Sequence, residues 1–278
     1  MPPVICSATT KSGAIPFSTQ STIGANLSQL FGPGHSNILL SVGETFTGVR
    51  LQAVCGRFNL IDSPEVQKLC KTLGIDLPEN ATQSDIAPGG QIKIIHSSEG
   101  ARRMSDAIWW LLLDGKTLKP NYRYASFNSR FEKLFIENSL SYKPFRESRC
   151  IIPCSAFIEG LGDKKTYHKV ELENSAIAFG GLYKEYLNQI TGEIVHSASI
   201  ITLLPSSHQW DKIHPKSMPL MIDFSDNRSV AQWLDSGFTS VSELRALISS
   251  TGKRPMRVTP IGRPSKWNVI GDSLSILA

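Results

Sequence analysis

The charged side chains of this chain are almost all confined to the part that follows residue 54. The chain carries 29 Lys and Arg and 24 Asp and Glu, and only three of them precede residue 55: Lys11, Glu44 and Arg50. Ser, Thr and Gly fill 19 of these first 54 positions, and neither Trp nor Tyr occurs there. Such a segment has too few apolar anchors for a core, so we expect residues 1–54 to be a flexible extension with at most a short strand over 38–42. Residues 55–278 are then the folded domain.

The composition as a whole is that of an ordinary globular protein. Hydrophobic residues make up 41% of the chain, which excludes collagen and chain-wide disorder, and the net charge of +5 permits a polyanionic partner without requiring one. Five cysteines, an odd number without regular spacing, fit a reducing compartment better than a disulfide framework. No apolar run approaches the roughly 18 residues of a membrane span, and the start lacks the features of a secretory signal. We therefore expect a cytoplasmic protein that does not enter a membrane.

The pattern after residue 55 predicts strands with helices at their edges. A helix is expected to begin at Pro64, with Ser63 as its N-cap and an apolar stripe as far as Leu73. Apolar or alternating runs predict strands over 91–96, 150–152, 167–172, 176–182 and 197–204. Two more helices are predicted over 229–235 and 241–248. Strands and helices do not alternate, so the predicted class is α+β: a single domain on an antiparallel, open-barrel-like β-sheet core with peripheral helices.

Four short motifs contain residues suited to chemistry. They occupy residues 54–58 (VCGRF), 126–130 (SFNSR), 149–160 (RCIIPCSAFIEG) and 213–220 (IHPKSMPL). Taken alone, each motif is weak. A lone cysteine such as Cys55 is more often a buried apolar side chain than a nucleophile, Asn128 fits a turn, Glu159 fits a strand end, and His214 fits a loop.

In this order and at these intervals, the four motifs resemble the SOS-response-associated peptidase family, abasic-site processing proteins that crosslink themselves to damaged DNA. The resemblance extends from about Cys55 to Asn268. It implies that an N-terminal cysteine condenses with the ring-opened aldehyde of an abasic site in single-stranded DNA to give a thiazolidine. We expect neither a cofactor nor a metal. The resemblance also implies a role for each of four residues: Cys55 is the nucleophile, Asn128 orients it, Glu159 exchanges protons near the amine, and His214 assists ring opening or crosslink release.

The chain departs from the family pattern at Cys55, which is internal in the sequence as written. A peptide-bonded cysteine has no α-amine, the group whose reference pKa of about 7.7 to 8.0 makes it nucleophilic near neutral pH. Three explanations compete: self-cleavage before Cys55, a true extension that abolishes crosslinking, or a segment that is never translated. We expect the last, because Met1 is the only Met before Met104 and Val54 is what a GTG start codon decodes to internally.

DNA contacts are predicted from basic and aromatic residues near the motifs. Arg57 and Arg130 are expected to hold phosphates beside the lesion, with three basic neighbours: Arg123, Lys212 and Lys216. Four aromatic residues offer stacking surfaces, although core packing explains the tryptophans equally well: Tyr122, Tyr124, Trp109 and Trp110. Asp85 stands where the family commonly has asparagine, and a carboxylate near phosphate would weaken binding. The predicted partner is single-stranded DNA with an abasic site, bound by a monomer.

Two other classes of protein remain as alternatives. An N-terminal-nucleophile amidohydrolase would also use a freed Cys55, with Asn128 as oxyanion donor, but it has no use for the motifs of Glu159 and His214. A non-catalytic single-strand-binding module would not need Cys55 at all. A metal site formed by Cys150, Cys154 and His168 is disfavoured, because the spacing lacks the paired ligands of structural zinc.

Overall fold

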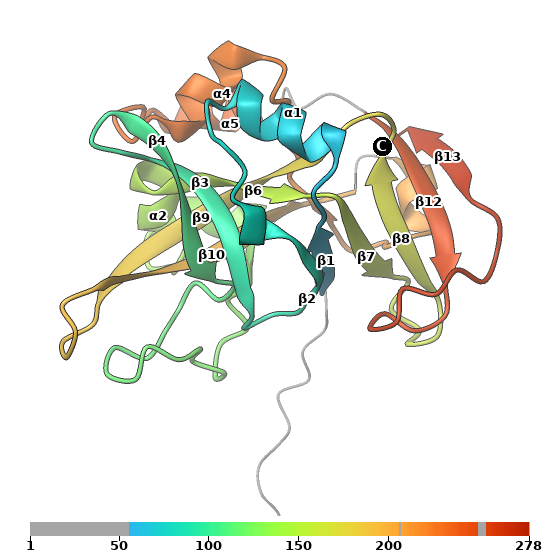
Figure 1. Cartoon of the computed structure of the whole chain (residues 1–278), viewed down its shortest axis with the longest axis horizontal. Helices are drawn as coiled ribbons and strands as arrows, with labels where there is room; N and C mark the ends of the chain where they lie inside the picture. Colours follow the sequence, from blue (N-terminus) through green and yellow to red (C-terminus); the bar gives the residue numbers. More distant parts are fainter. Residues whose placement is uncertain (1–55, 206, 250–253, 278) are drawn as a thin grey trace, which may run out of the picture. The chain divides into compact units, whose positions relative to one another are not determined.

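The computed structural model describes residues 56–205, 207–249 and 254–277. The predicted extension over 1–54, its strand over 38–42 and Cys55 itself lie outside these described residues. The described chain forms two β-sheets with helices packed around them (Figure 1). Its helices are α1 (Pro64–Thr72), α2 (Tyr142–Glu147), α3 (His208–Asp211), α4 (Asn227–Leu234) and α5 (Val241–Ser249), with 3-10 turns at Glu79–Ala81 and Phe131–Phe135.

The first sheet is antiparallel throughout and has the strand order β13-β12-β8-β7-β1-β2. Its members, in chain order, are β1 (Arg57–Leu60), β2 (Gln83–Ile86), β7 (Ala156–Gly160), β8 (Tyr167–Leu172), β12 (Pro255–Ile261) and β13 (Leu274–Leu277). Strand β1 therefore has a hydrogen-bonded neighbour on each edge, β2 on one side and β7 on the other. The first described residues thus enter the interior of a sheet.

The second sheet closes on itself as a five-stranded ring, β10-β4-β3-β6-β9, because β9 and β10 also pair with each other. Its members are β3 (Gln91–Ser98), β4 (Ala101–Ile108), β5 (Asn128–Arg130), β6 (Arg149–Cys154), β9 (Ile177–Leu187), β10 (Ile194–Leu203) and β11 (Met218–Pro219). The predicted α+β class with a barrel-like core is confirmed. The ring differs from a purely antiparallel sheet in that β10 runs parallel to β4 and to β5.

Most of the predicted elements are present with slightly different ends. Helix α1 begins at Pro64, and the hydroxyl of Ser63 accepts a hydrogen bond from the Val66 N–H at 3.3 Å, as an N-cap does. Strand β8 has the predicted bounds, whereas β3, β6, β9 and β10 extend beyond theirs or are shifted. In the described part of the chain, every helix is too short or too polar to span a bilayer.

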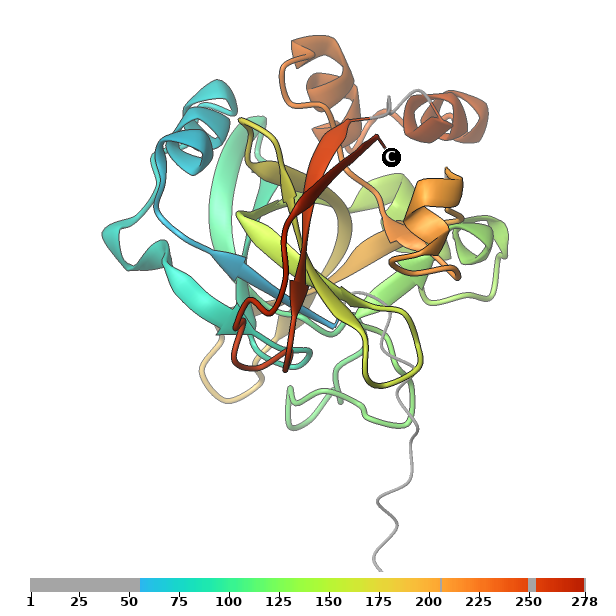
Figure 2. The same cartoon turned by 90° about the vertical axis from the view of Figure 1, so that its right-hand side faces the viewer.

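Figures 1 and 2 show α1, α4 and α5 at one end and the loops after β7 and β12 at the other. Aromatic side chains fill the space between the sheets, where Phe58 packs edge-on against Trp109 and Phe179 at centroid distances of 4.8 and 6.0 Å. Each of these three side chains is at most 1% exposed. The core thus fixes β1 to strands of both sheets.

Two glycines of β9 allow neighbouring segments to pack closely on that strand: Gly180 meets Leu220 of the segment that follows β11, and Gly181 meets Ile152 of β6. The Gly180 N–H donates to the Leu220 carbonyl at 2.9 Å. A methyl group at Gly180 would lie 2.5 Å from Leu220 Cδ2, and one at Gly181 would lie 2.8 Å from Ile152 Cδ1. Any larger residue at Gly180 would therefore push away Leu220, the last residue of the His214 motif.

Arg149 caps the C-terminal ends of α2 and α4 with its buried side chain. Its side chain is buried, and its guanidinium donates to five backbone carbonyls, those of Phe145, Arg146, Trp233, Asp235 and Phe238. The carbonyls at a helix C-terminus have no partner within the helix, and a cation there also interacts favourably with the helix dipole. Burial lowers the pKa of Arg149 to about 10, opposed by the nearby charge of Asp235. This member of the third motif is therefore structural.

Candidate functional site

Glu159 and His214 meet in the interior, near the end of β7. Phe157 pairs with Phe58 and faces the core, and strand alternation turns Glu159 toward the same side. His214 follows helix α3, whose Trp210 anchors the loop by donating its indole N–H to the Ser217 carbonyl at 2.8 Å. His214 Nδ1 lies 3.8 Å from Glu159 Oε2, and the two side chains are only 4% and 1% exposed. Two motifs distant in sequence thus join in one buried pair.

The tautomer of His214 follows from its backbone contact. His214 Nδ1 lies 2.6 Å from the Gly160 carbonyl oxygen, which can only accept, so Nδ1 carries the proton. Burial lowers the pKa of His214, and Lys216 lowers it further, while the Gly160 hydrogen bond acts in the opposite direction. The imidazole is therefore neutral at pH 7, and its buried Nε2 is an unprotonated acceptor with no hydrogen-bond partner among the described residues. Such a nitrogen is suited to accept a proton.

His168 is a second imidazole beside this pair. It lies directly opposite Glu159 in the β7–β8 ladder, so the two side chains leave the sheet on the same face. Its Nδ1 is buried and has no hydrogen-bond partner in the described part of the chain. Burial lowers the pKa of His168, opposed by the charge of Asp163. Sequence reasoning considered His168 only as a metal ligand, although its place in an alternating strand would have put it on the inner face.

Asn128 and three predicted basic residues line two adjoining hollows. The first, of about 540 Å³, is lined by Arg123, Asn128 and Arg130 among others, and the second, of about 300 Å³, by Arg130 and Lys216. Asn128 is held in β5 by its parallel pairing with Ile200 of β10. Arg130 belongs to both hollows, so the structure brings together residues of the second and fourth motifs.

The predicted aromatic contacts divide into exposed and buried residues. Tyr122 and Tyr124 are 58% and 57% exposed, so both present ring surface to solvent. Of the two alternatives for Trp109 and Trp110, core packing is the one observed, and neither offers a stacking surface, because both are fully buried. Their indole N–H groups donate to the carbonyls of Phe127 and Asn121, which fixes the chain that leads to Asn128. Lys212 is exposed in the loop before His214.

Arg57 is paired within the protein. Its guanidinium forms an ion pair with Asp85 of β2, and the side chains are 28% and 31% exposed. Asp85 also accepts the indole N–H of Trp267 at 3.0 Å. Sequence reasoning quoted Asp85 as a departure from the family pattern and gave Trp267 no role, because residues 182 positions apart carry no local signal of contact.

Cysteines of the third motif do not form a metal site. Cys150 and Cys154 are buried in β6, and burial raises the pKa of both thiols well above the ordinary value. Among the described residues, no group of three His, Cys, Asp or Glu side chains is arranged to hold a metal ion. The thiols are therefore core side chains.

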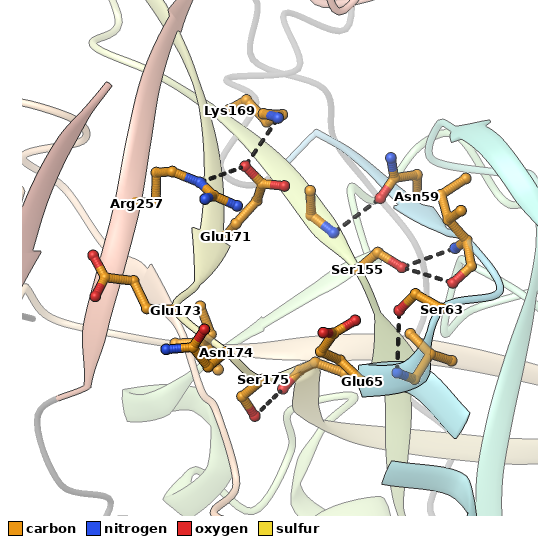
Figure 3. Close-up of a pocket in the computed structure, with 15 residues that line it drawn as sticks. Asn59, Ser63, Glu65, Ser155, Lys169, Glu171, Glu173, Asn174, Ser175 and Arg257 are labelled. Atoms are coloured by element: carbon orange, nitrogen blue, oxygen red, sulfur yellow. Dashed lines mark hydrogen bonds and ion pairs between the residues drawn. The ribbon is translucent and has the colours of Figure 1, made fainter. Parts of the chain in front are cut away.

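A separate pocket of about 590 Å³ contains none of the predicted site residues. It lies between the start of α1 and strands β8 and β12, where Lys169 and Arg257 both pair with Glu171, at 2.9 and 3.3 Å (Figure 3). Glu65 and Glu173 also line the pocket, so that charges of both signs are mixed and the pocket shows no clear preference for a charged ligand.

A comparison with family profiles shows which protein family the chain belongs to. The sequence profile described as SOS response associated peptidase, or SRAP, matches residues 54–264, which is more than half of the chain. The chain belongs to the SRAP family. The SRAP profile spans all four motifs, and family membership supports a function associated with DNA damage.

Solved structures share the SRAP fold seen here at low sequence identity. A Bacteroides thetaiotaomicron protein is 18% identical with a TM-score of 0.56, covering 74% of this chain and 92% of its own. A Bordetella bronchiseptica protein is 14% identical with a TM-score of 0.55, covering 81% and 99%. A phage-related protein from the same organism is 15% identical with a TM-score of 0.53, covering 78% and 100%. A search of curated proteins returned no significant match.

Proposed function

We propose that this SRAP protein binds single-stranded DNA in the cytoplasm and crosslinks itself to abasic sites through an N-terminal Cys55. The observation that carries the proposal is the buried pair of Glu159 and His214, whose Nδ1 and Oε2 atoms lie 3.8 Å apart. A single-strand-binding module has no need of a buried carboxylate beside a neutral imidazole, whereas proton transfer does. Removal or non-translation of residues 1–54 supplies the α-amine.

The proposed reaction joins one amine and one thiol to one aldehyde carbon. The neutral α-amine of Cys55 adds to the ring-opened aldehyde, and loss of one water gives an imine. The thiol then adds to the imine carbon and its proton passes to the nitrogen, which closes a five-membered thiazolidine. Glu159 exchanges the protons that leave and rejoin the nitrogen and the departing oxygen. In ring opening, the bond between C1′ and the ring oxygen breaks, the C1′ hydroxyl proton passes to the unprotonated Nε2 of His214, and the ring oxygen takes up a proton from water.

The DNA strand is expected to follow the two hollows that share Arg130. Arg123, Arg130 and Lys216 are exposed there and suited to phosphates, and Asn128 lines the first hollow. Tyr122 and Tyr124 offer exposed rings on the chain segment that leads to Asn128, where flanking bases would stack for about 1 to 3 kcal/mol each. This arrangement grips the backbone and the bases without reading sequence.

The test uses protein that begins at Cys55 and an oligonucleotide with one abasic site, analysed on a denaturing gel. We expect a slower-migrating covalent band that is absent with an intact oligonucleotide and with Cys55→Ala. Cys55→Ser is the matched control: it keeps the amine but not the thiol, so a band should appear only after borohydride reduction of the imine. Protein expressed from the native gene, examined by intact mass, should lack residues 1–54. A folded Cys55-started protein that gives no band refutes the proposal.

A further inference from the structure

Asp85 joins three parts of the chain through its side chain. From β2 it pairs with the guanidinium of Arg57 in β1, and it accepts the indole N–H of Trp267 from the loop between β12 and β13. Arg57 stands two positions after Cys55 in the sequence. The carboxylate is therefore held against the basic residue that is closest in sequence to the proposed nucleophile.

The loop that carries Trp267 is built to keep this contact. Trp267 has a φ of 54°, an uncommon backbone conformation for a bulky residue. Its N–H donates to the Arg263 carbonyl at 3.2 Å, and the Gly262 N–H donates to the Asn268 carbonyl at 3.0 Å, so the loop folds back on itself. The indole thus reaches Asp85 from a backbone already ordered by its own hydrogen bonds. Asp85 is accordingly fixed from two sides.

The ion pair makes Arg57 different from the other predicted phosphate contacts, because its charge is balanced within the protein. Arg123 and Arg130 are exposed and, within the described residues, form no ion pair, so their charges are available to any strand that approaches. The charge of Arg57 is already balanced by Asp85. A phosphate at Arg57 would have to compete with Asp85 and would also meet its negative charge.

We propose that Asp85 is a specificity-determining residue, which neutralises Arg57 and thereby lowers the affinity of the protein for intact single-stranded DNA. The inference rests on the proposed function, because it takes single-stranded DNA to be the substrate. A low affinity for intact strands lets the protein dissociate from undamaged DNA. The covalent step at the abasic site then distinguishes damaged from undamaged DNA. Asp85 acts through Arg57 and touches no reacting atom.

The test measures binding of a fluorescein-labelled intact oligothymidylate by fluorescence anisotropy at several salt concentrations. We expect Asp85→Asn to bind about three- to tenfold more tightly at low salt. The slope of log K against log salt should steepen by about 0.7, the value for one more phosphate contact on a single strand. The gain should vanish in the double variant Arg57→Gln, Asp85→Asn. Asp106→Asn, which removes the same charge from an ion pair with Lys93 at 2.8 Å, is the matched control and should change little.

A second measurement does not depend on the folding of the Asp85 variant. Arg57→Gln alone should leave the salt slope nearly unchanged, because a neutralised Arg57 makes no phosphate contact, although the uncompensated carboxylate of Asp85 should weaken binding. Arg130→Gln should lower the slope by about 0.7. Wild-type binding with no tightening in a folded Asp85→Asn, or an equal loss of slope in Arg57→Gln and Arg130→Gln, overturns this inference alone. No binding by the wild type and Asp85→Asn alike would overturn the proposed function together with it.

Discussion

His214 Nδ1 lies 3.8 Å from Glu159 Oε2, and both side chains are almost completely withdrawn from solvent. The nitrogen shares its proton with the Gly160 carbonyl, which holds the ring in one tautomer and keeps Nε2 unprotonated. Burying an acidic side chain beside an imidazole costs free energy, and proteins place such groups mainly where chemistry requires them. We therefore expect removal of either side chain to slow the reaction more than it weakens DNA binding.

Glu159→Gln should separate proton transfer from packing. The amide has nearly the same shape but cannot exchange a proton, so we expect crosslinking to slow by about 100-fold or more, the range typical of a lost acid–base group. The measurement is single-turnover crosslinking by Cys55-started protein. Binding of an intact oligonucleotide should remain within about twofold of wild type, and a crosslinking rate equal to wild type would remove Glu159 from the mechanism.

Three wholly or partly buried histidines should make the protein sensitive to acid. Burial lowers the pKa of His96, His168 and His214 below the ordinary value of 6.5. The folded state therefore resists protons that the unfolded chain accepts, so stability is complete above pH 6.5 and falls as the pH drops through the lower folded values. Melting temperatures at pH 7.5 and 5.5 should show this decrease.

His96 offers a variant outside the candidate site. Its Nε2 contacts Ser105 Oγ at 2.9 Å, and burial, the charge of His196 and the charge of Arg103 lower its pKa, against opposing effects from Ser97 and Glu185. We expect His96→Gln, which still offers a hydrogen bond but cannot be protonated, to reduce the loss of melting temperature between pH 7.5 and 5.5. An unchanged loss would show that the acid sensitivity arises elsewhere.

Gly180→Ala should disturb the site from a distance. The added methyl group would lie 2.5 Å from Leu220 Cδ2, so the segment that follows His214 must move. Overpacking of this kind costs about 1 to 3 kcal/mol, and we expect a lower melting temperature together with slower crosslinking. Gly115→Ala is the control, because its position has a normal φ and nothing within 4 Å of the added carbon. Equal stability of the two variants would contradict the close packing of Leu220 against Gly180.

Arg149→Met should destabilise the fold without touching the site. Four carbonyls at the C-terminal ends of α2 and α4, and that of Phe238 beyond them, would lose their donor, and we expect a loss of at least about 3 kcal/mol in the free energy of unfolding. Urea unfolding measures this directly. Arg102→Met, which removes a single bond to the Leu73 carbonyl at 3.3 Å, should cost less than about 1 kcal/mol. A similar cost for both variants would refute the structural role of Arg149.

Local sequence signals predicted the helices and strands whose start, end or alternation is marked by their own residues. Helix α1 was predictable because Ser63 and Pro64 mark its start, and β8 because it alternates between flanking turns. Strand β4 was not, since charged residues interrupt its sequence and its strand conformation depends on pairing with β3 along its whole length. Closure of the ring by β4 and β10 joins segments about 90 residues apart, which no local pattern encodes.

The candidate site was only partly predictable for the same reason. The family resemblance indicated Glu159 and His214 but not their contact, because the hydrogen bond that fixes the ring joins residues 54 positions apart. Arg57 was predicted as a phosphate contact, while its ion pair with Asp85 depends on the pairing of β1 with β2. His168 was missed because its neighbour Glu159 lies across a strand ladder rather than along the chain.

Strand β1 has neighbours on both edges, and Phe58 within it is 1% exposed. Chain ends are ordinarily the most mobile part of a domain, and a reactive amine on such an end would sample many unproductive orientations. An amine released two residues before Arg57 would instead begin at the root of a strand that the core already immobilises. Because folding already orders this end of the chain, less entropy would be lost when the amine meets the aldehyde. The effective concentration of the nucleophile at the lesion would be higher for that reason.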